Sequence, residues 1–145
     1  MVHNPHPTRG YPWGEDFDAQ SANVESMIGS TSAVGCWPRG ASVYGCEEMS
    51  GNVWEWTRSL WGVEWQRPDF SYPYDVNDAR RENLDAGDSV SRVLRGGSWF
   101  SPRDLARCAF RNWDPPHHRS DLVGFRVVLR PSPGLDPLTS DPSDL

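Results

Sequence analysis

The sequence predicts a loop-rich domain with sparse regular secondary structure around a small antiparallel sheet. Thirteen glycines and thirteen prolines interrupt the 145-residue chain, which leaves little room for long helices. Eight tryptophans, four tyrosines and five phenylalanines supply much of the bulky apolar surface, so large rings must fill the core. Three short segments alternate in the manner of strands. A chain of this length fits a single domain.

The three strand candidates are residues 92–95, 107–111 and 124–130. In the second, Cys108 and Phe110 share one face, and in the third Phe125, Val127 and Leu129 do so. Residues 100–106 and 112–123 would connect them into an antiparallel sheet. Residues 66–89 form a long polar stretch, and a loop of that length in a compact domain is usually functional or mobile.

Residues 50–57, SGNVWEWT, are the most distinctive segment. Gly51–Asn52 is typical of a tight turn, and Trp54 and Trp56 would then occupy one face of a strand with Glu55 on the other. A carboxylate beside a turn with free carbonyls suits calcium, which prefers oxygen ligands. The alternative is that the tryptophans are core and Glu55 is solvated. Residues 57–65 are expected to form a short connection.

Charge and cysteine content exclude several classes of function. A net charge of -6 and a pI near 5.1 argue against a nucleic-acid partner, because phosphate binding needs basic side chains. The odd number of cysteines gives no closed disulfide framework. A bridge between Cys36 and Cys46 is conceivable, but buried free thiols, Cys108 included, are the favoured interpretation.

No signal segment or membrane-spanning run is present in the sequence, so we expect a cytoplasmic protein with no membrane partner. Residues 1–10 and 131–145, rich in proline and polar residues, are expected to be disordered. The domain itself is expected to span residues 11–130.

Five segments in order, YPWG, GNVWEWT, RVLRGGSW, RCAFRNW and GFRVV, resemble the formylglycine-generating enzyme (sulfatase-modifying factor) family. The resemblance implies a loop-rich α+β fold, a variant of the C-type lectin fold. Family domains begin earlier, with an RLPTEAEWE-like helix that has no counterpart before YPWG. The resemblance therefore implies a fold lacking its N-terminal half, whose exposed sheet edge would need a partner chain or the missing half-domain.

The resemblance also implies structural calcium. One ion would lie at the distinctive turn, and a second at a loop similar to the family's ANxxxS segment. The first set offers two carboxylates and the second none, so we expect the first to bind calcium more readily. The implied ligands are Glu48, Gly51, Val53 and Glu55 for the first ion, and Asn23, Val24, Ser26 and Ile28 for the second.

The catalytic residues of the family do not carry over. Its oxidases bind copper(I) through two cysteines shortly after GGS, but Ser101 stands at the first position and no second cysteine follows. A serine oxygen cannot replace a thiolate for this soft metal. The related sulfoxide synthases of thiohistidine biosynthesis take iron-binding histidines from a helical domain that this sequence does not contain. His117 and His118 are adjacent and would point apart.

We therefore expect a ligand-binding protein without catalytic activity, whose partner is a protein or another surface ligand. Variable proteins of diversity-generating retroelements use this scaffold and vary the residues between GGSW and GFR. We expect Trp99 and Phe110 to be core, and Phe100, Trp113, His117 and His118 to be exposed. A metal-dependent oxidoreductase and a sensor domain of a larger signalling protein remain the alternatives. The candidate binding residues are Phe100, Ser101, Arg103, Asp104, Phe110, Asn112, Trp113, Asp114, His117, His118, Ser120 and Leu122.

Overall fold

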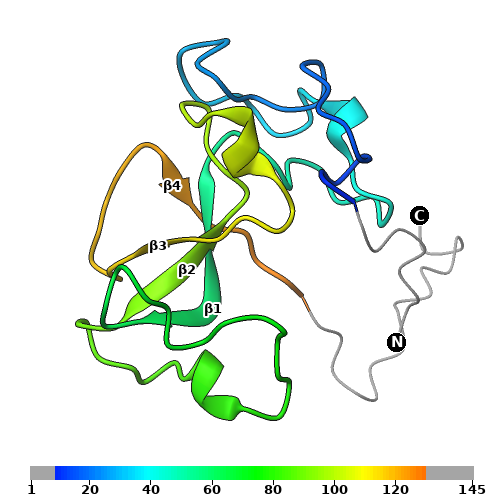
Figure 1. The fold of residues 1–145 in the computed structure, drawn as a ribbon. Helices are drawn as coiled ribbons and strands as arrows, with labels where there is room; N and C mark the ends of the chain where they lie inside the picture. Colours follow the sequence, from blue (N-terminus) through cyan, green and yellow to red (C-terminus); the bar gives the residue numbers. More distant parts are fainter. Residues whose placement is uncertain (1–8, 130–145) are drawn as a thin grey trace, which may run out of the picture.

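The computed structural model describes residues 9–129, which form a small curled sheet enclosed by long loops (Figure 1). Loops 9–50 lie at one end of the sheet and loop 66–89 at the other. The helical elements in this part of the chain are short 3-10 turns, so the α component expected of an α+β fold is not seen as an α-helix in residues 9–129. The strands are β1 (Trp54–Gly62), β2 (Ser91–Arg95), β3 (Asn112–Asp114) and β4 (Val123–Gly124), and the turns are η1 (Pro38–Gly40), η2 (Ala79–Glu82) and η3 (Arg103–Ala106).

The sheet has the strand order β3-β2-β1-β4. β2 pairs antiparallel with both β1 and β3, which confirms the antiparallel expectation for these strands. β4 is different, because it runs parallel to β1 with Trp54 opposite Val123. The expectation of an antiparallel last strand was therefore wrong: the chain crosses the sheet after β3 and returns beside the start of β1.

Two of the expected strand boundaries were also wrong. Residues 107–111 are not a strand, because η3 ends just before them at Ala106 and a turn follows, in which the Phe110 amide donates to the Arg107 carbonyl. The strand begins instead at Asn112. Residues 57–65 do not form a short connection, since β1 continues to Gly62 and pairs with β2 as far as Ser91.

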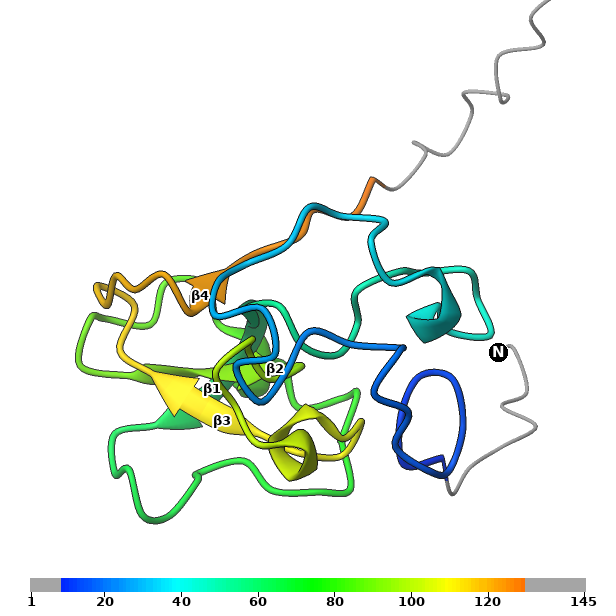
Figure 2. The same ribbon diagram turned by 90° about the horizontal axis from the view of Figure 1, so that it is seen from above.

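The last expected strand is paired only over Val123–Gly124. Beyond it, residues 125–129 run out from the sheet (Figure 2). Phe125, Val127 and Leu129 are 76%, 75% and 91% exposed, so they do not form the buried face that their alternation predicted. No strand within residues 9–129 covers this segment, and Arg130 lies outside the described residues.

The core has two parts. On one face of the sheet, Trp54, Leu60 and Leu94 are buried, and the Phe110 ring packs 6.0 Å from that of Trp54. This confirms the core role predicted for Trp54. The second part lies among the N-terminal loops, where Tyr11, Ala22, Val24 and Ala106 form a buried cluster flanked by Trp13 and Phe17. The rings of Tyr11 and Trp13 stack at 5.2 Å.

The Gly51–Asn52 turn joins these two parts. Both residues have left-handed backbones, with φ of 82° and 66°, which glycine and asparagine tolerate best. The Asn52 amide donates to the Asn23 carbonyl, and the Asn52 carbonyl accepts from the Trp99 amide, both at 2.8 Å. The Asn52 side chain pairs with both backbone groups of Ser32. The predicted tight turn is therefore confirmed.

The three cysteines are free, but each is exposed, so the expectation of buried thiols was wrong. Cys36 and Cys46 lie in turns and bends of the N-terminal loops, and Cys108 lies in the turn before β3. Short turns at the surface offer little apolar environment to cover a side chain. No helix among residues 9–129 is long and apolar enough to span a membrane.

We expect Gly51→Ala to destabilise the protein by about 2 kcal/mol or more. A Cβ at this position would lie 2.5 Å from the Asn23 carbonyl oxygen and would require a left-handed backbone. Urea unfolding measures the change in free energy. Gly87→Ala is the matched control, because a Cβ there meets nothing within 4 Å; equal effects of the two substitutions would contradict this account of the turn.

Candidate functional site

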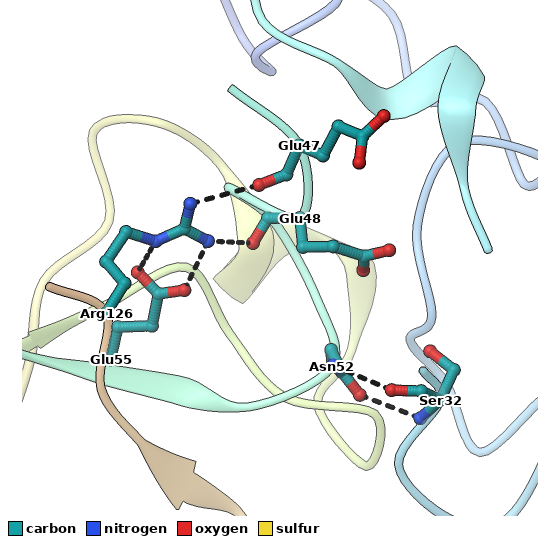
Figure 3. A network of polar contacts seen from close by, with 6 residues as sticks. All are labelled: Ser32, Glu47, Glu48, Asn52, Glu55 and Arg126. Carbon is teal, nitrogen blue, oxygen red and sulfur yellow. Dashed lines mark hydrogen bonds and ion pairs between the residues drawn. The ribbon is translucent and has the colours of Figure 1, made fainter. Parts of the chain in front are cut away.

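The first predicted calcium set surrounds the Gly51–Asn52 turn, next to a cavity of about 240 Å³. Glu48, Gly51, Val53 and Glu55 all line it. The Glu55 carboxylate does not face Glu48, because the Arg126 guanidinium holds both of its oxygens at 2.5 and 2.6 Å. Arg126 also donates to the Glu47 and Glu48 carbonyls, at 3.1 and 2.9 Å (Figure 3). A guanidinium in this position repels a divalent cation, so the arrangement does not fit a calcium ion shared by the two carboxylates.

Glu48 itself is buried, and its side chain points away from Glu55 in Figure 3. Burial raises the pKa of the Glu48 carboxyl, and the amides of Gly35 and Trp37 act against that shift. Neither carboxyl oxygen has a partner at normal hydrogen-bond geometry. A buried carboxylate left this way is costly, which makes Glu48 an unusual feature of this turn.

The second predicted set lies in the loop after Ala22. The Asn23 amide nitrogen donates to the Ser30 carbonyl and the Ser32 hydroxyl, while its buried Oδ1 has no partner. Glu25 and Ser26 follow in left-handed conformations, with φ of 55° and 56°. Such backbones are uncommon outside glycine and asparagine. An oriented oxygen without a donor is the kind of ligand that a hard cation takes.

The remaining members of the second set contribute less. The Val24 carbonyl accepts from the Met27 amide at 3.2 Å. Ser26 and Ile28 are exposed, and the nearby Glu25 carboxylate is paired with Arg103 at 2.7 Å. Within residues 9–129 no group of three or more His, Cys, Asp or Glu side chains could hold a metal ion.

The predicted binding residues do not form one surface. Those at positions 100–104 pack against the N-terminal loops, where the Glu25 amide donates to the Ser101 carbonyl and the Tyr11 hydroxyl to the Arg103 carbonyl. Phe100 is 63% exposed, as expected. Ser101 is only 5% exposed, so its inclusion as a ligand-contacting residue was wrong. Its hydroxyl accepts from the Ser98 amide at 3.0 Å and lies 2.9 Å from the Ser98 hydroxyl.

The predicted binding residues at positions 112–118 lie at the far end of the sheet, next to Trp61 and Trp65. The Trp113 ring lies 6.4 Å from Trp61 and 6.5 Å from Trp65, and we call these three residues the tryptophan cluster. Trp113 is therefore half-buried rather than exposed as expected. Trp65 is 62% exposed. At the end of β3, His118 Nδ1 lies 2.5 Å from Asp114 Oδ2, and both histidines are exposed, as expected.

The other members of the set are ordered by local contacts. Trp99 and Phe110 are half-buried, so the expected core role holds only in part. The Ser120 hydroxyl accepts from the Leu122 amide at 3.1 Å, and the Leu122 carbonyl accepts from the Trp54 amide, which fixes the entry into β4.

Sequence reasoning missed Trp61 and Trp65 because residues 57–65 were interpreted as a connection. The signal was present: Thr57, Ser59 and Trp61 follow one another at a spacing of two, as residues on one strand face do. The polar residues at 57–59 concealed the strand. A distant loop covers their side of the sheet, but the sequence pattern alone indicates that this side faces solvent.

Two cysteines, Cys46 and Cys108, line a cavity of about 350 Å³. Partial burial of the thiol raises the pKa of Cys108, and the guanidiniums of Arg95 and Arg9 act against that shift. A soft metal binds the thiolate, and a raised pKa disfavours that form of Cys108.

The small sheet, the GNVWEWT turn and the GGS segment define a sulfatase-modifying-factor type of domain. The chain belongs to the sulfatase-modifying factor enzyme 1-like domain family, which it matches over residues 6–131. Hercynine oxygenase of Mycolicibacterium thermoresistibile is 39% identical over 83% of this chain and 26% of its own length. The inactive C-alpha-formylglycine-generating enzyme 2 of Bos taurus is 30% identical over 81% of this chain and 36% of its own. The chain thus spans about a quarter to a third of these relatives.

Two solved structures share the fold. Treponema denticola variable protein 1 superimposes with a TM-score of 0.51 and 26% identity, over 73% of this chain and 34% of its own. PvdO from Pseudomonas aeruginosa does so with a TM-score of 0.52 and 26% identity, over 79% of this chain and 41% of its own. The family resemblance expected from the five segments is therefore confirmed.

We expect Glu25→Gln to lower the thermal midpoint at pH 7 and to lose that effect in acid. The hydrogen bonds to Arg103 hold the pKa of Glu25 below its ordinary value of 4.5. A lowered pKa stabilises the fold above the unfolded-state value, and this contribution disappears as the pH falls through the folded-state value. The difference in midpoint from wild type should therefore close as the pH falls below 4.5.

Glu64→Gln is the control for Glu25→Gln, because Glu64 is exposed and its side chain forms no ion pair within residues 9–129. A difference that persists unchanged at pH 3 would show that the ion pair is not its source.

Proposed function

We propose that this domain is a ligand-binding module without catalytic activity of its own, and that the tryptophan cluster is its contact surface. The observation that carries the proposal is Ser101. It occupies the position of the first copper-binding cysteine of the oxidases, and its buried hydroxyl is engaged with Ser98. No thiolate follows it before Cys108. The inactive relative in Bos taurus is consistent with such a role.

The tryptophan cluster supports the choice of surface. Trp and Arg are the side chains most enriched where binding energy concentrates, and here Trp65 is exposed beside Trp113 with the Arg111 guanidinium 5.3 Å from the Trp61 ring centroid. Rings of this kind supply contact area with few rotatable bonds. The ligand class we favour is a protein segment. A finer proposal is that the residues of this surface vary in sequence, as in variable proteins. The likeness to Treponema denticola variable protein 1 supports it.

A second candidate function follows from the hercynine oxygenases, one of which is 39% identical to this chain. In this alternative the domain contributes part of the substrate site of such an enzyme, and the metal ligands lie in other segments. Asn112, Trp113 and Asp114, at the end of β3 beside His118, would be the substrate-facing residues.

Selection from a random-peptide phage library tests the first proposal. We expect peptides that bind the wild-type chain to lose tenfold or more in affinity toward Trp65→Ala and to keep their affinity for Phe100→Ala, a ring of similar exposure elsewhere on the surface. In a parallel arm, hercynine is titrated against the wild-type chain and Asp114→Asn, with tryptophan fluorescence as the readout. Hercynine binding that Asp114→Asn weakens would favour the oxygenase, and peptides indifferent to Trp65→Ala would overturn the proposed surface.

We also propose that the Asn23 loop holds a structural calcium ion, supported by the buried Asn23 Oδ1 without a partner. The ion would be the partner that this oxygen lacks, and the Val24 carbonyl would lie beside it. Excess chelator should then lower the thermal midpoint by several degrees. Asn23→Asp should keep or strengthen that dependence, whereas Glu55→Gln should leave it intact. A midpoint that chelator does not change would reject the site.

A strand partner is the last part of the proposal. The exposed apolar residues at 125–129 extend from β4, and no strand within residues 9–129 pairs with them. A strand edge with unpaired backbone groups tends to pair with another strand. We propose that a further strand, from another segment or from a partner chain, lies against it.

A further inference from the structure

Loop 66–89 encloses a second polar site against the opposite face of the sheet from Trp54. In β2, Val93 and Arg95 alternate with the buried Leu94 and point to this face, and Val93 is buried there with 3% exposure. A cavity of about 70 Å³ lies between the loop and the strands, several times the room that one water molecule needs. Its lining combines arginine guanidiniums with hydroxyl groups, namely Arg81, Arg95, Arg111, Ser59, Tyr72 and Tyr74.

Arg81 is the most unusual member of this group. It is only 6% exposed, and its guanidinium lies 4.7 Å from the Tyr74 ring centroid and 5.6 Å from that of Phe70. One terminal nitrogen donates to the Ser71 carbonyl at 3.1 Å. Its Nε is buried and has no hydrogen-bond partner. A buried charged donor left unpaired carries a large desolvation cost, which an anion in the cavity would offset.

Arg111 approaches the cavity from the turn before β3. Its guanidinium lies 5.4 Å from the Tyr72 ring centroid and 5.3 Å from that of Trp61. Burial lowers the pKa of Arg111, the positive charges of Arg95 and Arg81 lower it further, and Tyr72 acts in the opposite direction. Within residues 9–129 its guanidinium donates no side-chain hydrogen bond and meets no carboxylate.

No acidic side chain neutralises this group in the described part of the chain. Glu82 is the acid that borders it, and its carboxylate accepts from the Tyr74 hydroxyl at 2.5 Å and lies 3.8 Å from Arg58. Arg95 is engaged with backbone carbonyls, among them that of Phe110 at 2.7 Å, so it adds charge rather than free donors. Three guanidiniums thus converge without a carboxylate, in a protein whose net charge is -6.

We propose that this pocket binds a small oxyanion group, a phosphate or a carboxylate, between Arg81 and Arg111. Guanidinium groups match the geometry of such anions and form charge-assisted hydrogen bonds with them. The tyrosine rings and the loop shield the site from water, which strengthens each of these interactions. The Ser59 side chain, which also lines the cavity, offers a hydroxyl donor to a third oxygen.

The size of the cavity restricts the ligand to an oxyanion or to the terminal group of a larger molecule. The rings of Tyr72 and Tyr74, 59% and 44% exposed, lie at the solvent side and would contact the rest of such a molecule. This inference goes beyond the proposed function and does not depend on it, because Trp65, the exposed ring of the tryptophan cluster, does not line the cavity.

Titration of the full chain with inorganic phosphate, at constant ionic strength maintained with sodium chloride, tests the site. Tryptophan fluorescence reports binding, since Trp61 adjoins Arg111, and the thermal midpoint provides a second readout. We expect phosphate to raise the midpoint and to change the fluorescence. Arg111→Gln should weaken phosphate binding roughly tenfold or more. Acetate in place of phosphate distinguishes a carboxylate site from a phosphate site.

Arg67→Gln is the matched control, because it removes the same charge from an exposed position of the same loop. Arg81→Lys keeps the charge and loses the planar donors, so it should weaken binding even if Arg81→Gln fails to fold. Equal phosphate responses in wild type, Arg111→Gln and Arg67→Gln would overturn the site, as would the absence of any response to both anions. Trp65→Ala should leave phosphate binding unchanged. A failure of the peptide-binding proposal can therefore be told apart from a failure of the oxyanion site.

Discussion

The left-handed turn at Gly51–Asn52 holds together parts of the chain that share no strand. Through its backbone and side chain, Asn52 reaches Asn23, Ser32 and Trp99. The Gly51 amide donates to Gly96 at 2.8 Å. In a chain whose described residues contain few regular elements, these bonds replace the ladders that usually order a backbone. The positions of the candidate cation loop, the GGS segment and the first residue of β1 all follow from this turn.

This arrangement separates the part of the molecule that maintains the fold from the part that is free to bind. At the end of the sheet near Asn52, polar groups are consumed by internal contacts: Arg126 holds Glu55, Arg103 holds Glu25, and Ser98 engages Ser101. At the other end, the Arg81 and Arg111 guanidiniums have no acidic partner among the described residues. Function is therefore expected where loop 66–89 and the end of β3 meet, rather than at the segment that identifies the family.

The family and the turn could be predicted from the sequence, because left-handed positions and paired tryptophans leave a local signature. The range of β1 could not, since Thr57, Arg58 and Ser59 are polar although they lie in a strand covered by a distant loop. Nor could the parallel pairing of β4, which depends on how the chain crosses the sheet. The contact of Arg126 could not be predicted either. Nothing near Glu55 in the sequence indicates that a residue 71 positions later donates hydrogen bonds to its carboxylate.

The contacts that close the N-terminal core reach far along the chain, and this bears on how the protein forms during synthesis. The Tyr11 hydroxyl finds its acceptor 92 residues later, and the Ser50 hydroxyl finds Ala106 after 56. Contacts of such separation form late, because a long loop must close before they contribute. As translation proceeds from the N-terminus, residues 11–50 leave the ribosome before their partners exist. Until η3 has been made, the Tyr11 hydroxyl lacks its acceptor and the N-terminal cluster lacks Ala106.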